Sequence, residues 1–400
     1  MKTEADFLPS GGVTSPGGFI AGAVHTGIKY PDPKRLDMGI LFSEKPCTAA
    51  AMFTTNEVKA APVLLDIQRL QKGKISAVIM NSGCANACTG EQGMADAIEM
   101  TELAAVLTGI KAESVMVSST GVIGNMMPME KVRVAVPKIK LTAAGGHDVA
   151  RAIMTTDRVP KEVAVKADGY TIGGMMKGSG MIHPNMATML CYITTDAAAD
   201  GDFLQKALVK AVDVSFHQMS VDGDGSTNDT ILLLANGVSG VTIKAGTPKA
   251  AAFKKVLNQV CIYLAREAVR DGEGATKLIE VKVSGAASAK DARLIARTII
   301  GSSLVKTAVY GCDPNWGRVL AAAGRSGAAL DPDKTELYMG DFYLLNNGVP
   351  QTFDKKAAKK YMQGKEVQFH LKLNLGKGEA KAWGCDLTEE YIKINAEYTT

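Results

Sequence analysis

The stretch 177–196 constrains the fold more than any other part of the chain, because it joins a glycine-rich turn to an apolar strand. Its first residues, Lys177-Gly178-Ser179-Gly180, and the following Pro184-Asn185 are typical of tight turns. Its last part, Thr188 to Thr194, is apolar and rich in β-forming residues, which predicts a buried strand. Thr188 is therefore expected where an irregular loop enters the protein core.

A threonine in such a place can act on its own chain. Backbone held between a turn and a strand can carry strain, and the Thr188 hydroxyl can attack the carbonyl of Ala187. An N-to-O acyl shift followed by hydrolysis would cut the Ala187–Thr188 bond. The new α-amine of Thr188 would titrate at about 7.7–8.0, so it could serve as general base for the hydroxyl of the same residue. An isolated Ala-Thr pair, however, is far more often an ordinary strand start.

The length and composition predict a soluble globular protein of more than one structural unit. The chain has 400 residues, of which 46% are hydrophobic and 22% charged, and this length predicts two or three units. The net charge of +4 is too balanced for a nucleic-acid-binding surface. No secretory signal or membrane span is evident. The seven irregularly spaced cysteines suit the reduced thiols of a cytoplasmic protein.

Two patterns that could bind metal are incomplete. Cys84 and Cys88 form a C-x3-C pair, but no second pair completes a zinc site. The run 222–225, Asp-Gly-Asp-Gly, lacks the ligand spacing and the closing glutamate of a calcium loop. His183 lies near Thr188 in the sequence, but we expect it to be an ordinary loop residue. We therefore predict no metal site.

Two loops that follow predicted strands carry small and polar residues. They span 81–90 and 119–124. Acyl transfer requires hydrogen-bond donors aimed at the oxyanion of a tetrahedral intermediate. Gly121 lets a backbone N–H approach closely, and the Thr120 hydroxyl could add a second donor. The spacing alone does not distinguish an oxyanion hole from an ordinary turn.

The remaining pattern alternates strands and helices, which predicts an α/β protein. The expected strands cover 37–42, 49–53, 76–80, 114–118, 163–165, 170–172, 231–235, 278–283 and 367–375. The expected helices cover 93–107, 200–219, 249–270, 289–302 and 319–324, with another ending near residue 154. Asp313-Pro314-Asn315 is expected to cap the helix that starts near Val319.

Several strings resemble those of one enzyme family. The run 177–190, K-G-S-G-M-I-H-P-N-M-A-T-M-L, is similar to the self-cleavage segment of the ornithine acetyltransferase family, also called glutamate N-acetyltransferase. The strings S-S-T-G-V-I-G at 118–124, T-T-D at 155–157, D-G-E-G-A-T-K at 271–277 and G-C-D-P-N-W-G-R at 311–318 also match. The resemblance extends from about Gly12 to the C-terminus.

The resemblance implies a layered α/β sandwich of two stacked sheets flanked by helices, with a smaller C-terminal α/β domain. It implies an α fragment, 1–187, that forms the first part of the core. Residues 188–284 would begin the β fragment and complete the core with the nucleophile strand. Residues 285–400 would form the smaller domain, whose tail returns to the active site.

The resemblance also implies roles for individual residues. Thr188 would be the nucleophile released by cleavage after Ala187, and Thr120 and Gly121 would form the oxyanion hole. The implied substrate contacts are Thr155, Lys177, Thr188, Glu273, Asn395 and Thr400. By charge, Lys177 suits a substrate carboxylate and Glu273 an ammonium group. Without the resemblance, 155–157 would be an ordinary turn and Glu273 a solvated turn residue.

The implied reaction moves an acetyl group from N2-acetyl-L-ornithine to L-glutamate through an acetyl-threonine intermediate, in arginine biosynthesis. It needs small amino-acid substrates and no cofactor. The implied assembly is a cytoplasmic heterotetramer of two α and two β fragments, with no nucleic-acid or membrane partner. One alternative is an N-terminal-nucleophile aminopeptidase or amidase with water as acceptor, and another is a binding protein that is never cut. The sequence leaves open whether acetyl-CoA is also a donor and whether arginine inhibits.

Overall fold

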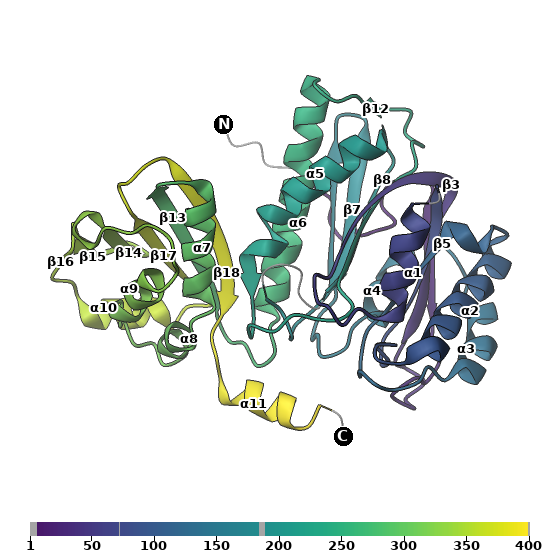
Figure 1. The fold of residues 1–400 in the computed structure, drawn as a ribbon, viewed down its shortest axis with the longest axis horizontal. Helices are drawn as coiled ribbons and strands as arrows, with labels where there is room; N and C mark the ends of the chain where they lie inside the picture. The colour runs from purple at the N-terminus through teal and green to yellow at the C-terminus, as the bar shows by residue number, and fades with distance from the viewer. Residues whose placement is uncertain (1–5, 72, 184–188, 399–400) are drawn as a thin grey trace. The chain divides into compact units, whose positions relative to one another are not determined.

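The computed structural model describes residues 6–71, 73–183 and 189–398, so Ala187, Thr188 and Thr400 lie outside the described residues. The chain divides into two compact units (Figure 1). The first consists of Met1–Gly178, Asn185–Val212 and Gly225–Leu264, and the second of Ser179–Pro184, Asp213–Asp224 and Ala265–Thr400. The division of the chain at 187 and 284 stays a prediction.

The first unit is built on a sheet with the strand order β1-β6-β7-β8-β11-β3-β4-β5, in which β2 also pairs with β3. The strands are β1 (Asp6–Phe7), β2 (Phe19–Val24), β3 (Met38–Phe53), β4 (Ile75–Asn81), β5 (Val115–Ser119), β6 (Lys161–Ala167), β7 (Tyr170–Lys177), β8 (Leu190–Thr195) and β11 (Thr230–Ala235). The short strands β9 (Ala198–Ala199) and β12 (Thr242–Ile243) pair separately.

Strand β3 joins two parts of this sheet, and the prediction of two short strands at 37–42 and 49–53 is wrong. Residues 38–43 of β3 pair with β2, and residues 48–53 pair with β11. The chain stays extended through Glu44-Lys45-Pro46, and the pairing with β4 shifts between Phe42 and Cys47. Glu44, Lys45 and Pro46 are exposed, so this part of the strand lacks the apolar pattern of a buried strand.

The two parts of the sheet stack face to face. Leu41 and Val78 from one part share a hydrophobic core with Leu190, Tyr192 and Leu232 from the other. Alternate residues of a strand point to opposite faces. The next residues along, such as Ile40 and Ile79, accordingly pack in a second core with the helices α1 (Ala61–Leu70), α2 (Gly90–Thr108) and α3 (Met129–Ala135).

Helices cover both outer faces of the stacked sheets. One layer contains α1, α2 and α3. Helix α4 (Gly146–Ala152) instead packs in the core between the two parts of the sheet, through Val149 and Ala150. The other outer layer contains α5 (Gly201–Asp213) and α6 (Pro248–Arg270), where the Phe253 ring lies 5.8 Å from the rings of Tyr170 and Phe203. The prediction of two stacked sheets flanked by helices is confirmed.

The predicted helix 200–219 is too long. Helix α5 ends at Asp213, and a 3-10 turn (Phe216–Gln218) and strand β10 (Met219–Ser220) follow. Met219 and Ser220 pair in parallel with Trp383 and Gly384 of β18 (Gly378–Cys385). The helical spacing of apolar residues continues past Asp213, but here pairing with a distant strand overrides local propensity.

The second unit has one sheet with the order β10-β18-β13-β17-β14-β15-β16. Its further strands are β13 (Leu278–Ala286), β14 (Glu336–Met339), β15 (Phe342–Asn346), β16 (Val349–Pro350), β17 (Glu366–Lys372) and β18 (Gly378–Cys385). Its helices are α7 (Ala289–Ile300), α8 (Ser303–Tyr310), α9 (Gly317–Gly324), α10 (Lys355–Met362) and α11 (Glu389–Ala396).

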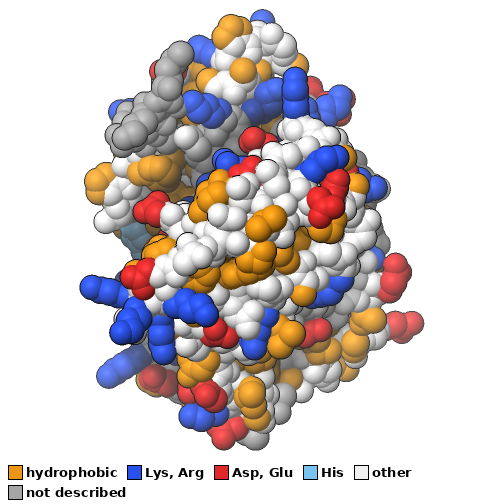
Figure 2. Space-filling model, turned by 90° about the vertical axis from the view of Figure 1, so that its left-hand side faces the viewer, with side chains coloured by type: hydrophobic (Ala, Val, Ile, Leu, Met, Phe, Trp, Pro, Cys, Tyr) orange, Lys and Arg blue, Asp and Glu red, His pale blue; other side chains and the backbone are white. Residues whose placement is uncertain are grey.

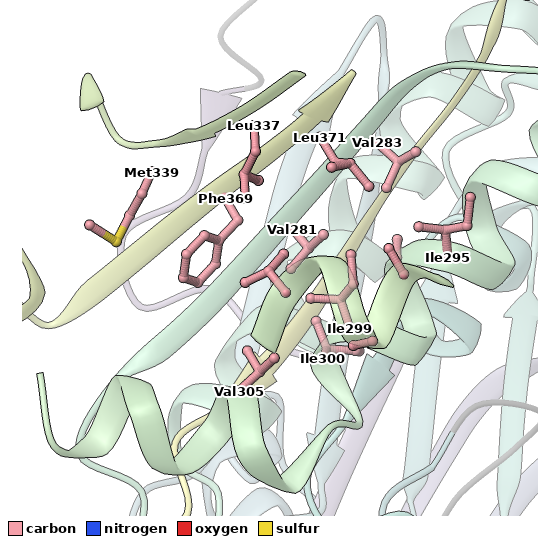
Figure 3. Close-up of a cluster of buried hydrophobic side chains, with 14 of the residues drawn as sticks. Val281, Val283, Ile295, Ile299, Ile300, Val305, Leu337, Met339, Phe369 and Leu371 are labelled. Carbon is pink, nitrogen blue, oxygen red and sulfur yellow. The ribbon is translucent and has the colours of Figure 1, made fainter. Parts of the chain in front are cut away.

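The core of this unit lies between the sheet and α7 (Figure 3). Val281 and Val283 of β13 and Leu371 of β17 lie opposite Ile295 and Ile299 of α7. Helix α7 is capped by the residue directly before it, because the Ser288 side chain accepts a hydrogen bond from the Asp291 N–H at 3.1 Å.

Helix α9 lacks the cap that the sequence predicts. It begins at Gly317, and its N-cap residue is Trp316, whose side chain accepts no capping hydrogen bond. Asp313, Pro314 and Asn315 instead line a small pocket with Phe369 and other residues. The Asp-Pro-Asn string therefore shapes the approach to the helix without capping it.

Charged side chains of both signs are interspersed on the face drawn in Figure 2. This mixture agrees with the small net charge of the sequence. Within the described part of the chain, none of the helices combines the length and hydropathy required to cross a membrane.

Candidate active site

The loop after β5 is built around Gly121. The Thr120 N–H donates to the Asn81 carbonyl at 3.0 Å, which ties this loop to the loop after β4. Gly121 has a φ of +138°, and a Cβ there would lie 2.3 Å from the Gly83 carbonyl carbon and 2.5 Å from the Cys84 nitrogen. Only glycine fits both the conformation and the space. The two glycine-containing loops that the sequence places far apart thus form one structure.

Asn228 holds these two loops together. Its Nδ2 donates to the Ala85 carbonyl at 2.6 Å and to the Ser119 carbonyl at 2.9 Å. The side chain is buried, so both hydrogen bonds are shielded from water. Sequence reasoning assigned no role to this residue.

Lys177 brings a positive charge to the loop after β5. It is the last residue of β7 and only 3% exposed. Its Nζ donates to the Thr120 Oγ1 at 3.4 Å. A buried ammonium group beside a hydroxyl and a closely approaching backbone N–H forms an environment that favours an anion.

Thr155 is tied to the same region through Asp157. The Thr155 N–H donates to Asp157 Oδ2 at 3.1 Å. Asp157 Oδ1 accepts from Lys161 Nζ at 2.6 Å and from the Gly178 N–H at 2.7 Å. Burial alone would raise the pKa of the Asp157 carboxyl, but the ammonium groups of Lys161 and Lys177 and the hydrogen bonds outweigh it and lower the pKa to about 2. Asp157 is therefore an ionised, buried junction, a role that sequence reasoning did not assign.

Asp229 anchors the beginning of β8. Its Oδ1 accepts the Met189 N–H at 2.8 Å, and Met189 directly follows Thr188 in the chain. Burial raises the pKa of the Asp229 carboxyl well above its usual value, against the lowering effects of the Met189 N–H and the Lys177 charge. Among the described residues, Asp229 Oδ2 has no hydrogen-bond partner.

In the second unit, the structure brings Glu273 and Asn395 together. Asn395 Nδ2 donates to Glu273 Oε2 at 2.7 Å, and the Glu273 N–H donates to the Ser179 carbonyl at 2.8 Å. Glu273 is 8% exposed, so it is not the solvated turn residue of the alternative interpretation. A Cβ at Gly180 would lie 2.3 Å from Glu273 Cδ, so the glycine makes room for the carboxylate.

The C-terminal helix α11 is attached to the Glu273 loop. The Thr388 side chain caps the helix and donates to the Gly274 carbonyl at 2.8 Å. Asn395 lies on this helix, so its side chain is placed by the helix. Of the predicted tail contacts, Asn395 is placed, whereas Thr400 lies beyond the part of the chain that the structure describes.

Asp222 stabilises the backbone of residues 181–182 in the second unit. Its two oxygens accept the N–H groups of Met181 and Ile182 at 2.6 and 2.9 Å. Burial raises its pKa, although these hydrogen bonds lower it. The carboxylate thus fixes the segment just before residues 184–188. His183 Nδ1 lies 3.5 Å from Ser220 Oγ, and burial lowers the pKa of this imidazole.

The predicted site residues that the structure describes therefore fall into two sets. Thr120, Gly121, Thr155 and Lys177 gather in the first unit around the loop after β5, Asp157 and the end of β7. Glu273 and Asn395 form a hydrogen-bonded pair in the second unit.

The chain matches the ArgJ family over residues 20–400. It is 51% identical over 405 residues to the arginine biosynthesis bifunctional protein ArgJ of Dehalococcoides mccartyi, with 100% of both chains covered. It is 52% identical over 398 residues to the protein of the same name from Symbiobacterium thermophilum, with 98% of this chain and 99% of the relative covered. The crystal structure of arginine biosynthesis bifunctional protein argJ from Bacillus halodurans is 42% identical, has a TM-score of 0.51, and covers 52% of this chain and 98% of its own. The chain belongs to the ArgJ family.

Proposed function

We propose that this protein transfers the acetyl group of N2-acetyl-L-ornithine to L-glutamate, giving ornithine and N-acetylglutamate. As a member of the ArgJ family, the chain is an acyltransferase of arginine biosynthesis that acts on small amino-acid substrates. The observation that carries the chemistry is the glycine-dependent loop at Thr120 and Gly121 with the buried Lys177 ammonium beside it.

The nucleophile of this reaction is Thr188, released by self-cleavage. The Thr188 hydroxyl attacks the Ala187 carbonyl, and the amide becomes an ester. Water then hydrolyses the ester, leaving a carboxylate on Ala187 and a free α-amine on Thr188. The Bacillus halodurans argJ chain supports a cut near the middle, because nearly all of it aligns to only half of this chain.

Acetyl transfer proceeds in two halves. The Thr188 amine takes the proton of its own hydroxyl, and the oxygen attacks the acetyl carbonyl of acetylornithine. The oxyanion receives hydrogen bonds from the Thr120 hydroxyl and the Gly121 N–H. Ornithine leaves with the proton from the Thr188 amine. The glutamate amine then attacks the acetyl-Thr188 ester by the reverse sequence, which makes the kinetics ping-pong.

Each unit offers a charged group that suits part of an amino-acid substrate. Lys177 suits the carboxylate, and the buried Glu273 suits an ammonium group, with Asn395 orienting its Oε2. Thr155 and Thr400 complete the proposed contacts. The reaction in this form needs no cofactor, whereas a second activity with acetyl-CoA as donor would make acetyl-CoA a substrate.

The first experiment compares the wild type with Thr188→Ala. Denaturing electrophoresis and mass spectrometry should show fragments 1–187 and 188–400 for the wild type and one intact chain for the variant. Only the cleaved protein should convert acetylornithine and glutamate. An intact wild-type chain that is fully active, or an active Thr188→Ala variant, would refute the proposal. Acetate release without glutamate, at the rate of transfer, would instead identify an amidase.

Further arms of this experiment test the finer parts of the proposal. Acetyl-CoA replaces acetylornithine in one arm, with and without arginine. Native mass spectrometry tests for a heterotetramer of two α and two β fragments, and cell fractionation tests for a cytoplasmic location. Lys177→Met should raise the KM for acetylornithine more than it reduces cleavage, and an unchanged KM would exclude its binding role.

A further inference from the structure

We propose that Asp157 is a positioning residue for acetyl transfer, whose buried carboxylate holds two substrate-binding segments in fixed geometry. One segment contains Thr155, and the other is the Lys177–Gly178 peptide at the end of β7. This inference rests on the proposed function, because both segments contain residues assigned there to substrate binding.

The hydrogen bonds of Asp157 join segments that the chain separates. Its Oδ2 accepts the Thr155 N–H at 3.1 Å, and its Oδ1 accepts the Gly178 N–H at 2.7 Å. The Gly178 N–H belongs to the same peptide group as the Lys177 carbonyl, so this hydrogen bond also fixes the backbone of Lys177. Gly178 has a φ of +148°, a conformation that glycine adopts readily and other residues rarely do.

Lys161 completes the junction from a third segment. It is the first residue of β6, and its Nζ donates to Asp157 Oδ1 at 2.6 Å. The side chains of Lys161 and Asp157 are 1% and 0% exposed. β6 also pairs with β7 in the register Lys161↔Met176, directly before Lys177. The pairing of β6 with β7 thus holds Lys161, which in turn ties Asp157 to the end of these two strands.

An ionised carboxylate suits this position better than an amide. Asp157 accepts three hydrogen bonds with two oxygens. An asparagine offers one acceptor oxygen and one NH2 group, so Asp157→Asn would set a donor against the Thr155 N–H or against the Lys161 ammonium and the Gly178 N–H. That substitution should displace at least one of the two segments.

A purely electrostatic role makes a different prediction. The negative charge of Asp157 interacts electrostatically with the ammonium group of Lys177. If only charge mattered, Asp157→Asn would strengthen binding of a substrate carboxylate near Lys177. Lys161→Met would weaken the same binding, because it leaves the Asp157 charge without its partner.

The test measures KM and kcat for acetylornithine, per mole of cleaved enzyme, together with the cleaved fraction and Tm. The variants are Asp157→Asn, Asp157→Glu and Lys161→Met. Asp157→Glu keeps the charge but moves the oxygens by one methylene, so it remains informative if either other variant fails to fold. Glu99→Gln is the matched control, because Glu99 forms an exposed ion pair with Arg133 between α2 and α3.

We expect all three variants to raise the KM by about tenfold or more, with a smaller change in kcat, and the control to match the wild type. Opposite KM changes in Asp157→Asn and Lys161→Met, with a normal Asp157→Glu, would show a charge effect and overturn the inference. A lowered Tm with unchanged KM in every variant that folds would show a purely structural role and overturn it too. A wild-type enzyme without acetyl transfer would instead refute the proposed function.

Discussion

The Gly121→Ala substitution should lower kcat more than any other substitution that adds a single methyl group to the loop after β5. The new Cβ would lie 2.3, 2.5 and 2.7 Å from the Gly83 carbonyl carbon, the Cys84 nitrogen and the Gly83 Cα. All three atoms are backbone, so no side chain can rotate away. The φ of +138° is also one that an L residue rarely adopts.

The expected size of the effect follows from these two facts. Strain at such a φ costs about 1–3 kcal/mol, and relief of the contact with Gly83 requires the Gly121 peptide to move. Loss of one oxyanion donor lowers kcat by about 10²–10³, equivalent to about 2.7–4 kcal/mol. Because the donor acts on the transition state, KM should change little. Gly121→Ala should therefore lose at least about a hundredfold in kcat.

The assay is steady-state acetyl transfer from acetylornithine to glutamate, normalised to the cleaved fraction. Gly124→Ala is the matched control, because Gly124 lies in the same loop with a φ of +85° and has no atom within 4 Å of an added Cβ. The control should lose about 1–2 kcal/mol of stability and keep its kcat. A Gly121→Ala enzyme with a kcat close to that of Gly124→Ala would refute the oxyanion role of this loop.

Three further predictions follow from other contacts. Folding lowers the pKa of Asp157 from 3.8 to about 2, so its carboxylate stabilises the fold above about pH 4. This stabilisation, about 2 kcal/mol, is lost as the pH falls toward 2. In denaturant unfolding, the free energy of unfolding should therefore fall less steeply with acid in Asp157→Asn than in the wild type, and an unchanged pH dependence would contradict this account. Gly180→Ala should raise the KM for acetylornithine, because its Cβ displaces the Glu273 carboxylate, and a normal KM would exclude that carboxylate from binding. Thr388→Ala removes the cap of α11 at a local cost of about 1 kcal/mol; amide exchange in α11 should accelerate at nearly constant Tm, whereas unchanged protection would contradict this role.

Much of the architecture could be predicted because it depends on short-range patterns. The apolar run after Thr188 predicted the strand observed as β8 (Leu190–Thr195), and the helical spacing in 249–270 predicted α6. Motif resemblance then supplied the family and the stacked-sheet fold, and both are confirmed. The run is continuous in β8 because both faces of this strand are buried, and the spacing in α6 arises because burial of one helix face imposes a period of 3.6.

Local patterning failed where partners far along the chain decide the structure. The sequence predicted two separate strands at 37–42 and 49–53, but pairing on both sides keeps β3 extended between them. The apolar spacing past Asp213 suggested more helix, but β18 recruits Met219 and Ser220 as a strand. Neither β11 nor β18 is near these segments in the sequence, so no local window contains the deciding information.

The amino-acid sequence identifies the residues with reactive or charged groups: the hydroxyls of Thr120 and Thr188, the Lys177 ammonium and the Glu273 carboxylate. How the described groups are held depends on contacts between distant parts of the chain. Asn228 joins carbonyls 143 and 109 residues away, and Asp157 bonds a peptide 21 residues later. Hydrogen bonds of this kind depend on atomic positions within fractions of an ångström, which arise from packing of the whole unit and leave no periodic trace in the sequence.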